Sequence, residues 1–327
     1  MRKKISIEEL SQKGSEQIID DMSKTRYSLL KSLGCGGIIA RFFWVRYACL
    51  FFMDMAARRA KRRKYHRLRP CVALKTALGT IFAGGAPSVI QPSFPRPNCG
   101  FVIGFNHPSL GEIIRLMGVC MLDYPTHKYL FPVNIFWYEA LSPVIDRLAE
   151  FGFTITPMIT PSAMKIMLKR AHTSMAKAQV KRLTRDFGEI YLDKCAKFIA
   201  EKNIVLVAPS ARRKWYLFDS AEQAKGLKPV KPMTITALAE YLFSKGLEFA
   251  LLPVAVIPPE GASRGLNLLG VYEIHPCNLI SSAEMARREF DGREADGKTR
   301  RLERYFLEKI AIELSRNNAD DMITKPD

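Results

Sequence analysis

Strand-length apolar runs alternate with longer amphipathic stretches along most of the chain. The short runs are bounded by Gly, Pro or polar residues, and the stretches between them repeat apolar residues at helical spacing. The predicted strands are 101–105, 129–133, 153–156, 204–208, 249–257 and 270–274. The predicted helices are 111–122, 134–150, 162–182, 187–202, 233–245 and 298–314. Such alternation predicts an α/β fold in which helices cover a mixed sheet.

The region before this alternation has a different pattern. Residues up to about 86 read as helices, and a loop rich in proline follows, with Pro87, Pro92, Pro95 and Pro97. We therefore expect an N-terminal helical region over residues 1–97 and an α/β domain over residues 98–327.

Charge suggests what the helical region contacts. Lys and Arg number 50 against 32 Asp and Glu, which gives a net charge of +18 and attracts anionic partners. The densest cluster, residues 58–69, separates two apolar segments, 37–57 and 71–86. Arg41, Arg46 and Asp54 make the first a poor membrane span, but its Phe, Trp and Tyr residues are typical of helices lying among headgroups. We expect a membrane-associating region on an anionic surface; the alternative is an ordinary helical subdomain packed on the core.

A second basic stretch, Ser162 to Arg185, admits three interpretations. It could form another basic face near the membrane or a groove for an acidic acyl carrier. A solvated helix face is the simplest interpretation and the one favoured by sequence alone.

Other features of the sequence indicate which cofactors and which cellular location to expect. The seven cysteines are scattered, odd in number and without Cys-x-x-Cys spacing, which indicates reduced thiols and no structural zinc. No cofactor is expected, and His66, His127, His172 and His275 are assigned to the surface or the core. Residues 5–26 are too polar for a signal peptide, so we expect the protein in the cytosol or on the cytoplasmic face of a membrane.

The segment 104–112, Gly-Phe-Asn-His-Pro-Ser-Leu-Gly-Glu, carries the candidate chemistry. It follows an apolar strand, and Pro108 suits the start of a helix. Two residues five apart within a helix point about 140° away from each other. With His107 in the turn before the helix, however, Glu112 can reach one imidazole nitrogen and leave the other free to take a proton from a hydroxyl. Alternatively, His107 caps the helix and Glu112 is a solvated first-turn acid.

Asn106-His107 with an acid five residues later resembles the first motif of the glycerolipid acyltransferase superfamily, which includes glycerol-3-phosphate and lysophosphatidic acid acyltransferases. Members carry Asn-His-x4-Asp, so Glu112 in place of aspartate is a departure that keeps the charge. The resemblance spans about residues 98–276 and implies that His107 and Glu112 are catalytic. It also assigns Asn106 and Ser109 to substrate binding.

The later family motifs are matched in order. In the second, Gly152 and the strand after it match, but Thr156 and Pro157 stand where the family has a phosphate-binding arginine. In the third, an apolar strand leads to Pro209, and Arg213 falls in register with the family arginine between Arg212 and Lys214. The resemblance implies that these three cations bind phosphate, a role suited to arginine forks and mobile lysines. A solvated basic loop is the alternative. The fourth motif, a strand with an internal Val-Pro, matches 251–258.

Taken together, the motifs predict transfer of a fatty acyl group from acyl-CoA or acyl carrier protein to the hydroxyl of a glycerol phosphate or lysophospholipid. The expected partners are this lipid substrate, an anionic membrane surface and acyl carrier protein. Two alternatives remain: a catalytically inactive relative that binds membranes or lipids, and a basic nucleic-acid-binding protein. The sequence contains no recognised nucleic-acid motif, so no nucleic acid is expected as a partner.

Overall fold

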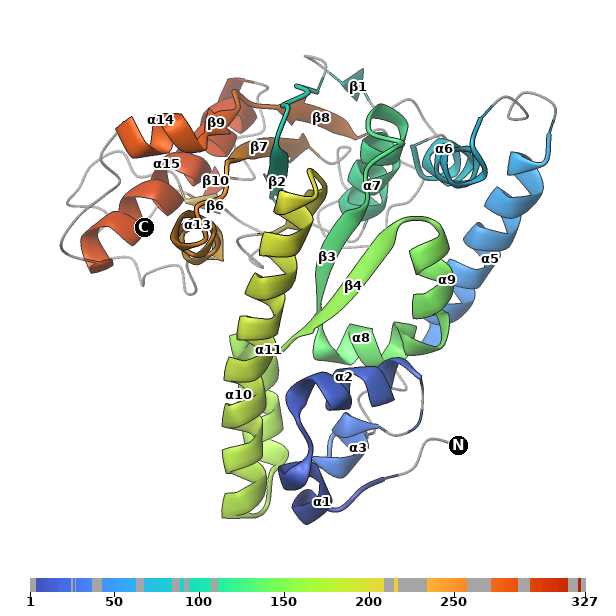
Figure 1. The fold of residues 1–327 in the computed structure, drawn as a ribbon, viewed down its shortest axis with the longest axis vertical. Coiled ribbons are helices and arrows are strands. Elements are labelled where there is room, and N and C mark those ends of the chain that lie inside the picture. Colours follow the sequence, from blue (N-terminus) through green and yellow to red (C-terminus); the bar gives the residue numbers. More distant parts are fainter. Residues whose placement is uncertain are drawn as a thin grey trace. The chain divides into compact units, whose positions relative to one another are not determined.

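The computed structural model of this chain shows an α/β protein with a mixed sheet covered by helices, as predicted (Figure 1). It describes residues 4–24, 26, 28–36, 43–62, 68–83, 89–90, 94–106, 111–208, 215–216, 234–257, 272–287, 295–316 and 323–324. The chain forms two compact units, each built from two segments. Unit 1 comprises residues 1–74 and 128–195, and unit 2 comprises residues 75–127 and 196–327. Both units take residues from each predicted region, and the boundary expected after residue 97 stays a prediction.

The sheet of unit 2 is built around β2. This strand, Gly100–Phe105, is parallel to β5 (Ile204–Val207) on one side and to β7 (Phe249–Ile257) on the other. All six β2 residues are buried, as a central strand covered on both faces requires. β7 continues antiparallel to β8 (Glu273–Pro276) and to β9 (Ile280–Ser281), and β8 pairs in parallel with β1 (Val89–Ile90). A separate parallel pair joins β6 (Trp215–Tyr216) and β10 (Ile323–Thr324).

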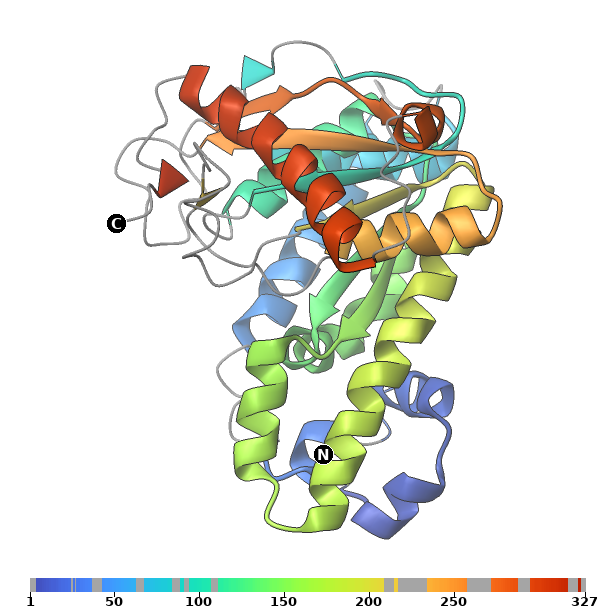
Figure 2. The same ribbon diagram turned by 90° about the vertical axis from the view of Figure 1, so that its left-hand side faces the viewer.

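Helices cover both faces of this sheet. On one face lie α13 (Thr234–Ser244) and α15 (Ala295–Arg316), which crosses close to β2 (Figure 2). A Cβ added at Gly104 would stand 2.5 Å from the Phe306 ring, so the approach of α15 requires glycine there. On the other face, α7 (Gly111–Asp123) packs against α6 (Pro70–Ala83) where Gly79 and Gly118 meet. The helix α14 (Ser282–Arg287) follows β9.

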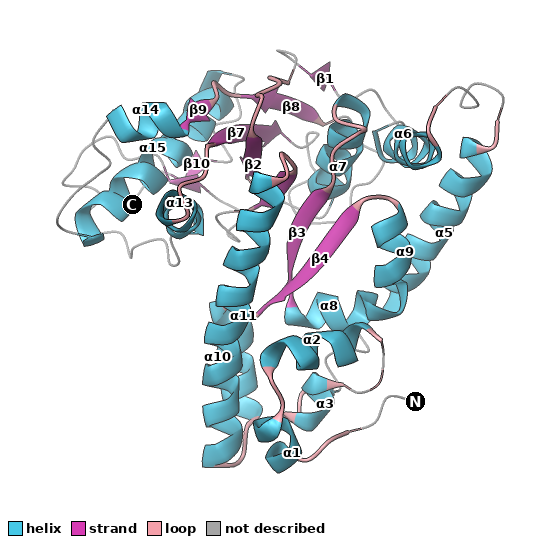
Figure 3. Ribbon diagram, viewed as in Figure 1, coloured by secondary structure: helices cyan, strands magenta, loops and turns pink. Residues whose placement is uncertain are grey.

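Unit 1 has a parallel pair of strands, β3 (Tyr129–Asn134) and β4 (Phe153–Met158), drawn side by side in magenta in Figure 3. Between them run α8 (Ile135–Leu141), a short 3-10 turn (Ser142–Val144) and α9 (Ile145–Glu150). Its other described helices are α1 (Ile7–Gln12), α2 (Ser15–Ser23), α3 (Leu29–Ser32), α5 (Phe43–Ala60), α10 (Pro161–Arg170) and α11 (Ser174–Ala200). The last five residues of α11, 196–200, belong to unit 2.

A buried carboxylate holds the amino-terminal helices of unit 1 to α8. Glu139 is fully buried and accepts hydrogen bonds from the Ser28 hydroxyl at 2.7 Å and from the Leu30 backbone N–H at 2.8 Å. Ser28 is the N-cap residue of α3 and Leu30 lies in its first turn, so Glu139 satisfies a backbone N–H that the helix start leaves unpaired.

Two predicted helix boundaries were wrong. The segment predicted as one helix over 134–150 is interrupted at Ser142 and Pro143. The break predicted between 182 and 187 does not exist, because α11 runs through it, and the chain turns instead at 171–173. There, the Thr173 hydroxyl accepts a hydrogen bond from the Ala176 N–H and so starts a new helix.

Two threonines near the end of β4 lead to opposite stability predictions. Among the described residues, the buried Thr156 hydroxyl has no hydrogen-bond partner, whereas the Thr160 hydroxyl accepts hydrogen bonds from Ala163 N–H and from the Asn134 side chain. Thr156→Val removes an unsatisfied buried group and is expected to raise the free energy of unfolding by about 1 kcal/mol. Thr160→Val removes a helix cap and is expected to lower it by about 1 kcal/mol. Urea unfolding measures both; a destabilised Thr156→Val protein would contradict the assignment.

Candidate functional site

The strand-to-helix junction predicted around His107 is confirmed. β2 ends at Phe105, Asn106 follows it, and α7 begins at Gly111, which places Glu112 in the first turn of that helix. His107 and Ser109 lie outside the described residues, as does the side chain of Glu112. The pairing of His107 with Glu112 therefore stays a prediction.

Asn106 fixes the end of β2. Its side chain is fully buried, with the amide nitrogen donating to the Val256 carbonyl at 2.8 Å and the amide oxygen accepting from the Val256 N–H at 2.6 Å. The amide thus imitates a backbone peptide and continues the ladder between β2 and β7 beyond its last residue pair, Phe105 and Val254. Only an amide offers one donor and one acceptor in this arrangement. The residue before His107 is therefore held in place; its predicted role in substrate binding stays a prediction.

Parallel pairing brings three of the four motifs to one edge of the sheet. Because parallel strands run in one direction, the chain leaves β2, β5 and β7 at the same edge. The register pairs Gly104 with Val207 and Phe105 with Val254, so the residues after β2 and β5 start from neighbouring positions. Arg212, Arg213 and Lys214 follow β5 and lie outside the described residues. In open α/β sheets, ligands bind beyond the carboxyl ends of the strands.

The second motif lies in unit 1 and is matched only in its backbone. Gly152 has φ +79°, a left-handed conformation that favours glycine, and β4 begins at the next residue. At the position of the family arginine, the buried Thr156 offers a hydroxyl in place of a cation. This segment supplies no phosphate-binding charge at that position.

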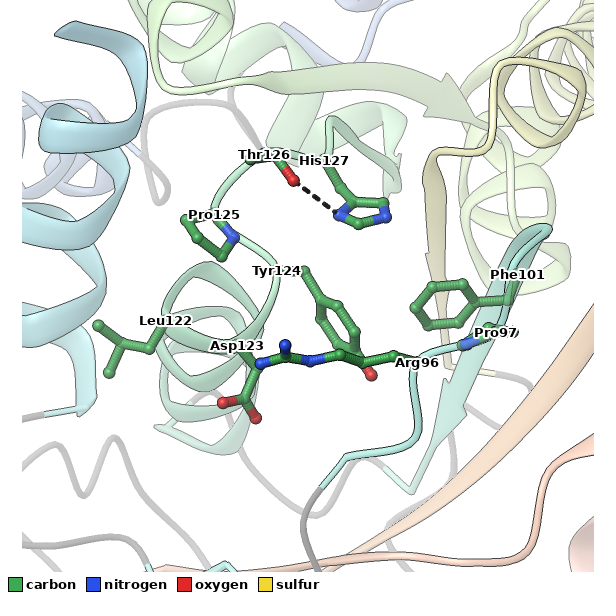
Figure 4. A pocket seen from close by; sticks show the side chains of 9 residues that line it. All are labelled: Arg96, Pro97, Phe101, Leu122, Asp123, Tyr124, Pro125, Thr126 and His127. Carbon is green, nitrogen blue, oxygen red and sulfur yellow. Dashed lines mark hydrogen bonds between the residues drawn. The ribbon is translucent and has the colours of Figure 1, made fainter. Parts of the chain in front are cut away.

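A pocket of about 320 Å³ lies near the opposite, amino-terminal end of β2 (Figure 4). Arg96, Pro97, Phe101, Leu122, Asp123, Tyr124, Pro125, Thr126 and His127 line it. The rings of Phe101, Tyr124 and His127 pack edge to face there.

Burial changes the acid–base behaviour of this pocket. It lowers the pKa of His127, with a further contribution from the Lys75 charge, and it raises the pKa of Asp123, with Arg96 opposing. Sequence alone places His127 at the surface or in the core. It gives no signal for the pocket, because the lining residues come from two separate segments and form no motif.

Comparisons of this chain with protein-family models, with curated proteins and with solved structures found no match. Among the residues that the structure describes, no helix is both long and apolar enough to cross a membrane. Within the same residues, no three or more His, Cys, Asp or Glu side chains are grouped so as to hold a metal ion. Burial raises the pKa of Cys49 to about 11 and those of Cys195 and Cys277 to about 12, which keeps these thiols protonated at neutral pH.

The two hydrogen bonds between the Asn106 side chain and the Val256 backbone, here called the clamp, can be tested by replacing the amide nitrogen alone. Asn106→Asp replaces the donor to the Val256 carbonyl by an oxygen, and we expect a loss of roughly 3 kcal/mol in the free energy of unfolding at neutral pH. A protonated carboxyl can donate again, so its pKa is raised in the folded state and the deficit relative to wild type should shrink as the pH falls. Urea unfolding of Asn98→Asp, at an exposed position, is the control; equal stability of the two variants would contradict the clamp.

Proposed function

We propose that this protein is an O-acyltransferase of the glycerolipid acyltransferase type, which moves a fatty acyl group from a thioester to the hydroxyl of a glycerol phosphate or lysophospholipid. One observation carries the proposal. β2, which precedes the Asn-His motif, lies between two strands parallel to it: β5, which precedes the third motif, and β7, which contains the fourth. The segments that carry His107 and the three cations therefore follow neighbouring strands at the same edge of the sheet. A general base and a phosphate site are the two parts that this reaction requires.

In the proposed mechanism, His107 removes the proton from the acceptor hydroxyl as the hydroxyl oxygen attacks the thioester carbonyl carbon. Glu112 orients the imidazole and stabilises its protonated form. The tetrahedral intermediate, stabilised by backbone donors or a nearby cation, then collapses as the carbon–sulfur bond breaks, and the leaving thiolate takes the proton from His107. Arg213, with Arg212 and Lys214, holds the acceptor phosphate. The products are an ester and a free thiol, and no metal or redox cofactor takes part.

The exposed face of α5 supports a position at an anionic membrane surface. Trp44, Tyr47 and Phe51 follow one another at helical spacing and are 47%, 60% and 63% exposed. Aromatic residues are favoured at the depth of lipid headgroups, and a basic end of the helix, Arg58 to Arg62, stands close to anionic lipids in such an orientation. The same face favours the second candidate, a relative that binds membranes without catalysis.

Activity of the His107→Ala variant distinguishes the two candidates. Wild type should transfer acyl groups from long-chain acyl-CoA or acyl carrier protein to at least one member of a panel of glycerol-3-phosphate and lysophospholipids. We expect His107→Ala to lower kcat by roughly 10³-fold, the size of a general-base contribution, and Glu112→Gln to lower it less.

His127→Gln, at the other end of β2, is the matched control and should retain activity. Turnover that survives His107→Ala, or that is lost only with His127→Gln, would overturn this assignment. Absence of turnover with every pair in a folded wild type would favour the non-catalytic candidate.

The phosphate site has a separate kinetic signature. Arg213→Ala should raise KM for a phosphorylated acceptor roughly 10- to 100-fold, because charge-assisted hydrogen bonds contribute about 1.5 to 3 kcal/mol each. Its kcat should change little if the bonds act equally in the ground and transition states. Arg213→Lys should restore part of the affinity. An unchanged KM in Arg213→Ala would exclude this residue from the acceptor site.

A further inference from the structure

Helices α10 and α11 form an antiparallel hairpin in unit 1 with an unusual charge pattern (Figure 2). No Asp or Glu occurs between Glu150 and Asp186, and seven cations do. They are Lys165, Lys169, Arg170, Lys177, Lys181, Arg182 and Arg185.

Two of the seven cations have partners within the fold. Arg182 donates hydrogen bonds to the carbonyls of Leu10 and Ser11 at 3.1 Å and of Lys13 at 3.3 Å. These carbonyls lie at the end of α1, so Arg182 joins the hairpin to the amino-terminal helices. Arg185 pairs with Asp186 at 3.3 Å. Arg182 thereby attaches the hairpin to the amino-terminal helices, whereas the Arg185–Asp186 pair lies within α11 itself.

The other five cations are exposed and make no ion pair or side-chain hydrogen bond in the part of the chain that the structure describes. They are Lys165, Lys169, Arg170, Lys177 and Lys181. The pairs Lys165 with Lys169 and Lys177 with Lys181 are each four residues apart on one helix, an arrangement in which like charges destabilise the helix. No described side chain offsets this repulsion, whereas an external anionic surface would.

Apolar side chains among these lysines indicate which anionic surface is involved. Ile166 and Met175 flank the hairpin turn and are 40% and 46% exposed. A nucleic-acid backbone offers nothing to such side chains, and the cores of protein interfaces are depleted in lysine. At a bilayer, apolar side chains enter the headgroup boundary while lysines stay hydrated beside lipid phosphates. The mixture therefore suits a lipid surface best.

We propose that the turn end of the α10–α11 hairpin, which carries the exposed side chains of Lys165, Ile166, Lys169, Arg170, Met175, Lys177 and Lys181 on more than one face of its two helices, docks on an anionic lipid bilayer. This contact is additional to the amino-terminal membrane region of the proposed function. It also does not depend on acyl transfer.

The test is equilibrium binding of the full chain to vesicles of phosphatidylcholine, with and without phosphatidylglycerol, near physiological salt. The hairpin variant replaces Lys165, Lys169, Lys177 and Lys181 by Gln. The matched control replaces four exposed cations outside both hairpin helices by Gln: Lys4, Lys202, Lys245 and Arg287. Both variants lose four positive charges, so any difference in their vesicle affinity depends on where those charges lie in the protein.

We expect the hairpin variant to bind phosphatidylglycerol vesicles roughly 600-fold more weakly than wild type, since each of the four lysines near an anionic leaflet contributes about fivefold. Binding of the control should fall by only about threefold, because distant exposed charges are screened. Ile166→Ser with Met175→Ser should weaken binding roughly tenfold on the same vesicles, from lost apolar burial.

Equal binding of the hairpin variant and the control would overturn the proposal. So would a hairpin-specific loss seen only with single-stranded RNA or with an acidic acyl carrier protein, because it would identify a different partner. Acyl transfer is not the readout here, and the α5 triple variant, Trp44→Ser, Tyr47→Ser and Phe51→Ser, is measured separately. Failure of this contact is thus distinguishable from failure of the proposed function.

Discussion

The pairing of β2 with β7, completed by the Asn106 side chain, is the constraint on which the candidate site depends. Asn106 and Val256 are 150 residues apart in sequence, and their two hydrogen bonds are fully buried. A buried polar group that lost its partner would destabilise the fold, so the end of β2 is held in a single position. His107 is the next residue along the chain. The residue that precedes the proposed general base is thus held in place, and fixed geometry is what catalytic positioning requires.

Unit 1 uses buried polar groups in a similar way for a different purpose. Glu139 satisfies the start of α3, and Arg182 satisfies carbonyls at the end of α1. Both contacts attach the amino-terminal helices to elements far away in sequence. Two other elements of unit 1 carry exposed aromatic or charged side chains. They are α5, with Trp44, Tyr47 and Phe51, and the hairpin, with its five exposed cations.

Several elements could be predicted from the sequence because their patterns are local. The strand predicted over 249–257 matches β7 at both ends, since nine apolar residues between Glu248 and the pair Pro258 and Pro259 admit little else. Helix breaks were harder. The amphipathic pattern continues across 171–173, where a threonine cap starts a new helix, so periodicity alone gave the wrong boundary.

The role of Asn106 toward Val256 could not be predicted, because no local signal reports a partner 150 residues away. The pocket around His127 was missed for the same reason. His107, Ser109, Arg212, Arg213 and Lys214 lie outside the described residues, and their predicted roles rest on motif and strand register.

In the proposed function, the segments after β2 and β5 form one site for donor and acceptor. Hydrogen exchange measured with and without a non-hydrolysable acyl-thioester analogue and glycerol-3-phosphate tests this most directly. The account predicts that ligands slow exchange together in residues 106–112 and 208–214. Slower exchange around 96–101 and 122–127 instead, or in neither loop at saturating ligand, would contradict it.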